Sequence, residues 1–263
     1  MKSDENDEIV YEIRGEAGWI TLNRPESRNA LTFAMYERLA EICAGARLGG
    51  AVKAIVVTGA GEKAFAAGTD MRQFRGFSKP ADALAYEEKI DRVLGAVEGC
   101  EVPTIAAISG ACTGGGAGIA AACDIRIATA DLKFGFPIAR TLGNALSISN
   151  LSRLTALAGA GRVKYMLLTA GLIGAEQAIE AGLISEIVQD HAALTERAGE
   201  LAATLATHAP ITMQATKEAM RRLRVEGAGA DDHDLIVKAY MSEDFKEGME
   251  AFLGKRKPVW KGR

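Results

Sequence analysis

The sequence is short of several features that would set it apart from an ordinary globular protein. Its formal net charge is −3, so it lacks the excess of positive charge that binds nucleic acid. It has no apolar run long enough to cross a membrane. It has only 3 histidines and 4 cysteines, and the cysteines show neither a C-x-x-C motif nor metal-ligand spacing. We therefore expect no nucleic-acid partner, no membrane span and no metal site.

The few cysteines and histidines are interpreted as structural residues. The cysteines, interpreted as buried free thiols in a reducing compartment, are Cys43, Cys100, Cys112 and Cys123. The histidines, interpreted as helix-surface residues, are His191, His208 and His233. The first eight residues are polar and acidic and do not resemble a signal or transit peptide, so we expect a cytoplasmic location.

Glycine, by contrast, is abundant, and it is concentrated in one informative segment. Residues 105–124 begin with an apolar run, continue through Gly114-Gly115-Gly116 and end in an alanine-rich run. This order predicts a buried strand, a tight loop and a helix. Ordering a glycine on folding costs more backbone entropy than ordering other residues, so three consecutive glycines need an explanation. Either another part of the chain packs closely against them, or a ligand binds to their exposed N–H groups. A helix N-terminus offers such unpaired donors.

Apolar periodicity predicts an α/β chain, with strands and crossover helices first and a helical last third. The expected strands are 8–14 and 19–22, which form a hairpin, then 54–58, one near 105, 124–128 and 183–188. The first expected helix begins at Thr32. Further helices are expected over 81–98, 145–158, 162–168, 175–181, 191–207, 211–224 and 231–252.

Two of the expected strands end in glycine-rich loops. One strand ends at Gly59 and leads to Gly68-Thr69, and the other ends at Gly110 and leads to Gly114-Gly115. The carboxyl ends of parallel strands lie at one edge of a sheet, where ligands bind. The two loops are therefore predicted to aim one backbone N–H each at a common point, as in an oxyanion hole.

At these loops the chain resembles the crotonase superfamily, the enoyl-CoA hydratase/isomerase family. Six motifs in the expected order carry the resemblance over nearly the whole chain: 23–25 with 29–31, 65–71 with 108–116, 123–124, 134–137, 178–188 and 247–256. The resemblance implies a spiral of ββα units over residues 1–200 and a C-terminal helical trimerisation region over 201–263. It also implies a homotrimer or hexamer.

The resemblance further implies an acyl-CoA thioester as ligand, with coenzyme A as part of the substrate and no other cofactor. The backbone N–H groups of Thr69 and Gly115 would hold the thioester oxygen and stabilise an enolate. The residues implied to line or approach the CoA groove are Arg28, Ala30, Ala67, Asp70, Met71, Gly114, Phe252 and Lys255, the last two possibly from a neighbouring subunit.

The chain departs from the family at two positions that matter for chemistry. Gly118 and Ile138 stand where hydratases of the family have their two glutamates. Hydration needs a base for water and an acid for carbon, and neither residue supplies one. The aspartate of dienoyl isomerases would sit near Leu146 and is also absent. These departures argue against ordinary hydration.

Other polar residues are candidates to replace the missing acids. Asp70 and Asp124 are interpreted mainly as structural, by capping or pairing near turns. Glu87 and Glu88 follow the first loop on a helix, and either would point inward or form a solvated face. The remaining candidates are Arg140, as a carboxylate ligand or a surface pair, and Asn144 and Ser147, as water-orienting or capping residues.

Three alternatives to a hydratase stay open. Loss of CO₂ from a malonyl-type thioester needs mainly enolate stabilisation, which two N–H donors supply. Isomerisation needs one base, which Glu87, Glu88 or Asp70 would have to provide. The third alternative is a non-catalytic acyl-CoA-binding or scaffold protein, favoured by Gly118 and Ile138 but not by the intact loops.

Overall fold

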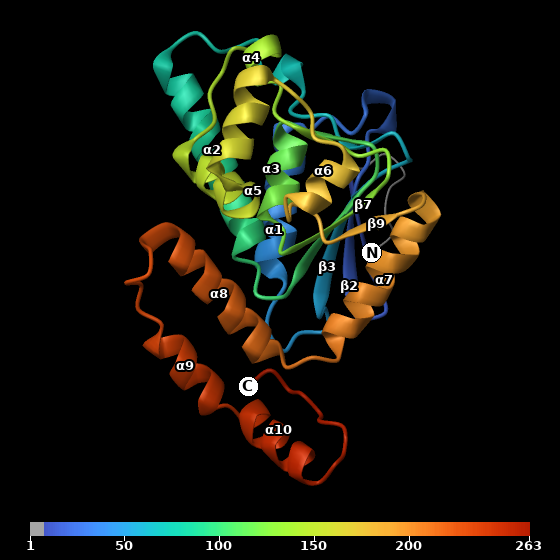
Figure 1. The fold of residues 1–263 in the computed structure, drawn as a ribbon, viewed down its shortest axis with the longest axis vertical. Helices are drawn as coiled ribbons and strands as arrows, with labels where there is room; N and C mark the ends of the chain where they lie inside the picture. The colour runs from blue at the N-terminus through green and yellow to red at the C-terminus, as the bar shows by residue number, and fades with distance from the viewer. Residues whose placement is uncertain (1–7) are drawn as a thin grey trace.

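The computed structural model describes residues 8–263 and has a mixed α/β fold (Figure 1). The prediction for the first seven residues lies outside the described range. A six-stranded sheet has the order β1-β2-β3-β5-β7-β9. Its strands are β1 (Ile9–Arg14), β2 (Ala17–Leu22), β3 (Ala54–Gly59), β5 (Thr104–Ile108), β7 (Ile125–Thr129) and β9 (Glu186–Val188). The predicted β1–β2 hairpin is confirmed as the antiparallel pair, and the other pairs are parallel.

A second, three-stranded parallel sheet was not expected from the sequence. It contains β4 (Ala64–Ala66), β6 (Ala111–Thr113) and β8 (Lys133–Gly135). Three strands of the first sheet, β3, β5 and β7, are each followed by a short strand of the second sheet and then by a helix. The chain therefore repeats a ββα unit, which confirms the predicted crotonase-like spiral.

Helices cover both faces of the large sheet. On one face lie α1 (Phe33–Gly45), α2 (Pro80–Glu98) and α3 (Gly115–Ala122), and on the other lies α7 (His191–Ala206). Along β3, Ile55 and Val57 pack into the larger core, while Val56 packs with Leu194 of α7. This arrangement explains the continuous apolar run in β3, because each face of the strand is covered. The alternation fails in β1, where Ile13 is 60% exposed.

Two helix predictions were wrong at their boundaries. The helices expected at 145–158 and 162–168 form a single α5 (Ile148–Thr169), which is kinked at Gly159, where φ is 74°. The single helix expected at 231–252 is instead α9 (His233–Tyr240) and α10 (Glu243–Leu253). Ser242 separates them, because its side chain accepts a hydrogen bond from the Phe245 N–H at 2.9 Å and caps α10. The remaining helices are α4 (Ile138–Thr141), α6 (Ala175–Glu180) and α8 (Pro210–Glu226).

The C-terminal helices extend away from the sheet (Figure 1). The α8 helix lies beside the body of the molecule, α9 and α10 continue outward, and the tail returns so that Trp260 Nε1 donates to the Thr207 carbonyl at 2.9 Å. The division expected between residues 200 and 201 falls inside α7, whose Ala202 still packs against the sheet. Within residues 8–263, no helix is both long and apolar enough to cross a membrane.

The first testable prediction concerns the close packing of α3 against β4. A Cβ added at Gly116 would lie 2.5 Å from the Ala66 carbonyl oxygen and 2.7 Å from its Cβ. We expect Gly116→Ala to lower the free energy of unfolding by about 1–3 kcal/mol, because this contact is with backbone. The control is Gly95→Ala in α2, where nothing lies within 4 Å of the added Cβ and a gain of about 0.5–1 kcal/mol is expected. Equal stabilities in urea unfolding would contradict this reading.

Candidate active site

The two glycine-rich loops meet in the structure, as predicted. Gly68 has φ 108° and Gly114 has φ 53°, conformations that side chains rarely allow. A Cβ at Gly114 would lie 3.4 Å from Cα of Gly68, so the two backbones are nearly in contact. This contact is the close approach that explains two of the glycines.

Two backbone N–H groups at this junction have no hydrogen-bond partner within residues 8–263. The chain around Thr69 pairs with Leu31 through the Gly68 carbonyl and the Asp70 N–H, so the N–H of Thr69 points the other way. Gly115 is the first residue of α3, and its N–H has no acceptor in the first helical turn. Both residues line the same cavity.

This cavity has a volume of about 340 Å³ and is mainly apolar. Its apolar wall comes from the segment 71–74, from α2 and from the segment around α4: Met71, Phe74, Ile90, Leu94, Phe136, Pro137, Ile138, Leu142 and Leu146. Its polar side chains are Thr69, Tyr86, Glu87, Thr113, Thr141, Asn144 and Asn150. The size and the few convergent polar groups are typical of a small-molecule site.

Glu87 is the single carboxylate among the described residues that line this cavity. Burial raises the pKa of Glu87, and the nearby negative charge of Asp91 raises it further. Asp91 is in turn held by the Ser147 hydroxyl, which donates to it at 2.7 Å. A carboxyl group with a raised pKa in an apolar cavity is well suited to accept and donate protons.

The model of one known family, described as enoyl-CoA hydratase/isomerase, matches residues 12–263. The chain belongs to this family. A short-chain-enoyl-CoA hydratase of Clostridium acetobutylicum is 31% identical, with 95% of each chain covered. An (E)-benzylidenesuccinyl-CoA hydratase of Thauera aromatica is 36% identical, covering 97% of this chain and 99% of the relative. The solved structure of a putative enoyl-CoA hydratase/isomerase family protein from Hyphomonas neptunium is 34% identical, with a TM-score of 0.90 over 99% of this chain and 100% of that one.

The cavity of this hydratase/isomerase family member contains both positions at which family glutamates are expected. Gly118 and Ile138 both line it, together with Thr69 and Gly115. A Cβ at Gly118 would lie 3.2 Å from Leu94 Cδ1, so Leu94 fills part of the space that a longer side chain would need. The position is open to the cavity but crowded.

Asp70 and Asp124, the first two candidates for replacement acids, do not line the cavity. The Asp70 carboxylate binds Arg24 and Arg72, and the hydrogen bonds from Arg72 hold its pKa well below the ordinary value. Asp124 bonds to Thr104 at the amino end of β5 and pairs with Lys217. The predicted structural role of both residues agrees with these contacts.

The other candidates divide between the cavity and the surface. Glu88 and Arg140 are exposed and lie outside the cavity lining, so neither faces the reaction space in this chain. Ser147 caps α5 by accepting the Asn150 N–H at 3.2 Å, as its capping interpretation predicts. Asn144 does line the cavity.

The predicted CoA-groove residues are only partly brought together. Ala67, Met71 and Gly114 line the cavity. The Arg28 carbonyl accepts a hydrogen bond from the Ala67 N–H at 3.0 Å, and Ala30 and Asp70 are linked to the same turn through Arg24. Phe252 lies in α10 and Lys255 just after it. Because α10 is at the end of the molecule far from α4 (Figure 1), neither residue reaches this cavity within one chain.

Sequence reasoning missed four residues of interest. Tyr36, Tyr86 and Asn150 lie at or beside the cavity, and Tyr36 was hidden among the apolar positions of α1. The surface interpretation of His191 was wrong, because it is half-buried and its Nδ1 lies 2.9 Å from Ser109 Oγ. The signal for Tyr86 was its place directly before Glu87 on the predicted helix. The four cysteines are free and buried, as predicted.

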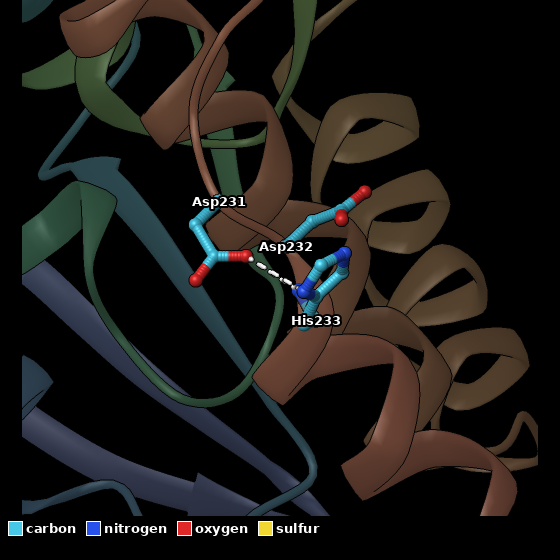
Figure 2. Close-up of side chains that lie close together, drawn as sticks. All are labelled: Asp231, Asp232 and His233. Atoms are coloured by element: carbon cyan, nitrogen blue, oxygen red, sulfur yellow. Dashed lines mark hydrogen bonds and ion pairs between the residues drawn. The ribbon is translucent and has the colours of Figure 1, made fainter.

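One group among the described residues brings metal-ligand atoms together. Figure 2 shows Asp231, Asp232 and His233 at the start of α9, with His233 Nδ1 3.5 Å from an Asp231 oxygen. The three residues are consecutive and exposed, and His233 N–H donates to Asp231 in a turn. These contacts fit the start of a helix.

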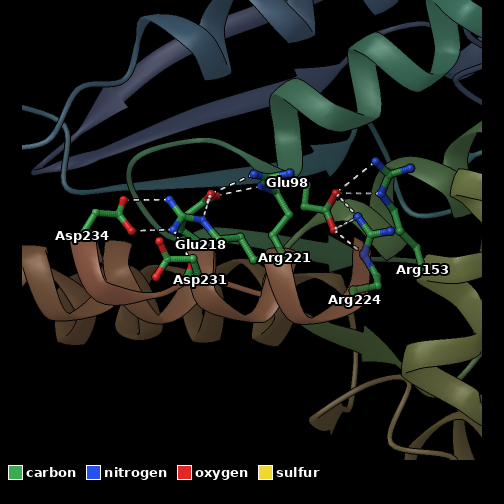
Figure 3. Close-up of polar contacts among 8 residues, drawn as sticks. Glu98, Arg153, Glu218, Arg221, Arg224, Asp231 and Asp234 are labelled. Carbon is green, nitrogen blue, oxygen red and sulfur yellow. Dashed lines mark hydrogen bonds and ion pairs between the residues drawn. The ribbon is translucent and has the colours of Figure 1, made fainter. Parts of the chain in front are cut away.

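A larger cluster of charged side chains holds α8 against α2 and α5 (Figure 3). Glu98, at the end of α2, accepts hydrogen bonds from Arg153 at 3.1 Å and from Arg224 at 2.6 Å. Along α8, Glu218 pairs with Arg221 at 2.7 Å. This cluster is separate from the cavity and fixes the position of the C-terminal region.

Proposed function

We propose that this protein binds an acyl-CoA thioester and stabilises its enolate with the backbone N–H groups of Thr69 and Gly115. The observation that carries the proposal is the pair of unpartnered N–H groups beside one apolar cavity. Donors of this kind interact more strongly with the enolate oxygen than with the neutral thioester, so they lower the barrier. One such donor is worth about 3 kcal/mol in other enzymes.

We assign Glu87 the role of acid and base. A single carboxylate suffices for isomerisation of a 3-enoyl thioester. Glu87 takes the proton from C2, the electrons move into the thioester oxygen to form a dienolate, and the same proton returns at C4. The product is the 2-enoyl thioester, and Glu87 ends as it began. The raised pKa of Glu87 suits both halves of this transfer.

Hydration is the second candidate, because relatives such as the short-chain-enoyl-CoA hydratase carry that name. In this case Glu87 would direct a water molecule to C3 while the proton of that water reaches C2. Decarboxylation of a malonyl-type thioester is less well supported, since the substrate carboxylate would lie beside Glu87.

We also propose where the rest of the substrate binds and how the chains assemble. We place the CoA moiety near Ala67, Met71 and Gly114, with Phe252 and Lys255 reaching it from a neighbouring copy. The apolar side chains exposed on α9 and α10, among them Tyr240, would be covered in a homotrimer or hexamer. No further cofactor is needed for any of these reactions, and we propose that the protein acts in the cytoplasm.

The second testable prediction concerns the proposed binding and turnover of acyl-CoA thioesters. The protein is titrated by thermal shift with crotonyl-CoA, a 3-enoyl-CoA and malonyl-CoA, and each thioester is then assayed for turnover. We expect all three to bind and the 3-enoyl-CoA to be isomerised fastest. Binding without turnover of any thioester would favour a scaffold protein, and absence of binding would overturn the proposal.

The third prediction tests the role of Glu87. We expect Glu87→Gln to lower kcat about 100-fold or more, and Glu88→Gln, on the exposed side of the same helix, to change it less than about 2-fold. A base must be deprotonated, so activity should rise with pH through the Glu87 pKa. Because the pKa of Glu87 is raised, this increase in activity should occur at a pH above about 4.3, the ordinary pKa of a glutamate. Equal activity of the two variants would exclude Glu87.

The fourth prediction concerns the two positions that lack carboxylates. We expect Gly118→Glu combined with Ile138→Glu to raise crotonyl-CoA hydration at least about 10-fold. Leu94→Ala is included because Leu94 Cδ1 lies 3.2 Å from the new Cβ. The matched control carries glutamine at both positions in the same background. If the glutamine control gains as much, the missing carboxylates are not what limits hydration.

A further inference from the structure

Three hydroxyl groups form a chain beside the proposed enolate site. Tyr36 Oη of α1 lies 2.9 Å from Thr69 Oγ1, and Thr69 Oγ1 lies 3.0 Å from Tyr86 Oη of α2. Tyr36 is fully buried, whereas Tyr86 lines the cavity. The chain therefore runs from the closed core to the space where a ligand would lie.

The burial of Tyr36 fixes the direction of these hydrogen bonds. Three hydroxyls carry three hydrogens, but the chain has only two links, so one hydrogen is left over. Within residues 8–263, Thr69 is the one hydrogen-bond partner of the Tyr36 hydroxyl. A buried phenol without an acceptor would pay the full desolvation cost of its O–H, so Tyr36 donates to Thr69.

The remaining hydrogen then belongs at the cavity end. With Tyr36 donating, Thr69 can donate in turn to Tyr86, and a head-to-tail chain is favoured because each bond polarises the next. This order leaves the hydrogen of Tyr86 unused by the chain. The Tyr86 ring is held by Phe33, Phe74 and Phe77, with centroids 5.8, 4.9 and 6.0 Å away, so its hydroxyl is positioned in advance.

We propose that the Tyr86 hydroxyl is a third hydrogen-bond donor to the thioester oxygen, beside the N–H groups of Thr69 and Gly115. This inference rests on the proposed enolate function. It assigns Tyr86 as a catalytic donor, and Tyr36 as a positioning residue that sets the direction of the chain. Burial raises the pKa of Tyr86, and the charge of Glu87 raises it too, so the phenol keeps its proton at neutral pH.

The fifth prediction uses acetoacetyl-CoA, whose enolate is detected by its ultraviolet absorbance. The apparent pKa of the bound ligand is measured by pH titration for the parent, for Tyr86→Phe and for Tyr36→Phe. We expect a lower pKa on the parent than in water. Tyr86→Phe should raise it by about 1 to 2, roughly a tenfold to hundredfold change, because a hydrogen bond to a charged oxygen is lost. Tyr36→Phe should raise it by less, since Tyr86 can then turn its hydrogen toward Thr69.

Two controls separate the possible failures. Tyr165→Phe removes an exposed hydroxyl on α5 and should leave the ligand pKa unchanged. An S-butyl-CoA thioether has no carbonyl oxygen, so its affinity should change less than about 2-fold in Tyr86→Phe. An unchanged ligand pKa in Tyr86→Phe overturns the role of Tyr86 and leaves the enolate proposal standing. A parent that binds acetoacetyl-CoA without lowering its pKa, or does not bind it, overturns both.

Discussion

The candidate site depends on one close contact between two stretches of backbone. Gly68 and Gly114 approach so nearly that a Cβ on Gly114 would lie 3.4 Å from the Gly68 Cα. Through this contact the loop after β4 and the helix after β6 present their N–H groups to one cavity. The interactions involve main-chain atoms of two ββα units, so the repeat itself sets their spacing. Side chains then decide what chemistry the cavity supports.

Those side chains make the cavity mostly apolar, and Glu87 is the one carboxylate among the described residues that line it. Glu87 and Tyr86 are neighbours on α2, and both have raised pKa values because they are buried. Gly118 and Ile138 add no charge to the cavity lining. An enolate formed here would meet donors from the loops and from α2, but no second carboxylate. The single carboxylate in the described lining distinguishes the site from one built around a pair of glutamates.

Much of the fold and part of the site were predictable from the sequence, for identifiable reasons. Some features could be predicted because they depend on neighbouring residues alone. The glycines Gly114-Gly115-Gly116 indicate a tight backbone turn, and the apolar run of β3 indicates a strand that is buried on both faces. The interruption expected after residue 158 is a kink at Gly159 rather than the end of a helix. The break at Ser242 was missed because apolar periodicity continues across it. Tyr36 contacts Thr69, which is 33 positions away along the chain, and His191 contacts Ser109, which is 82 positions away. No local sequence pattern encodes such distant pairs.

The Tyr36 hydroxyl also limits how this family member can change over time. A Cβ added at Gly115 would lie 1.8 Å from Tyr36 Oη and 3.1 Å from Thr69 Oγ1. No residue larger than glycine fits there while the tyrosine remains, and shortening Tyr36 first would open a void in the core. The two positions are therefore coupled, and among descendants of this sequence a side chain at 115 should arise only together with a smaller residue at 36.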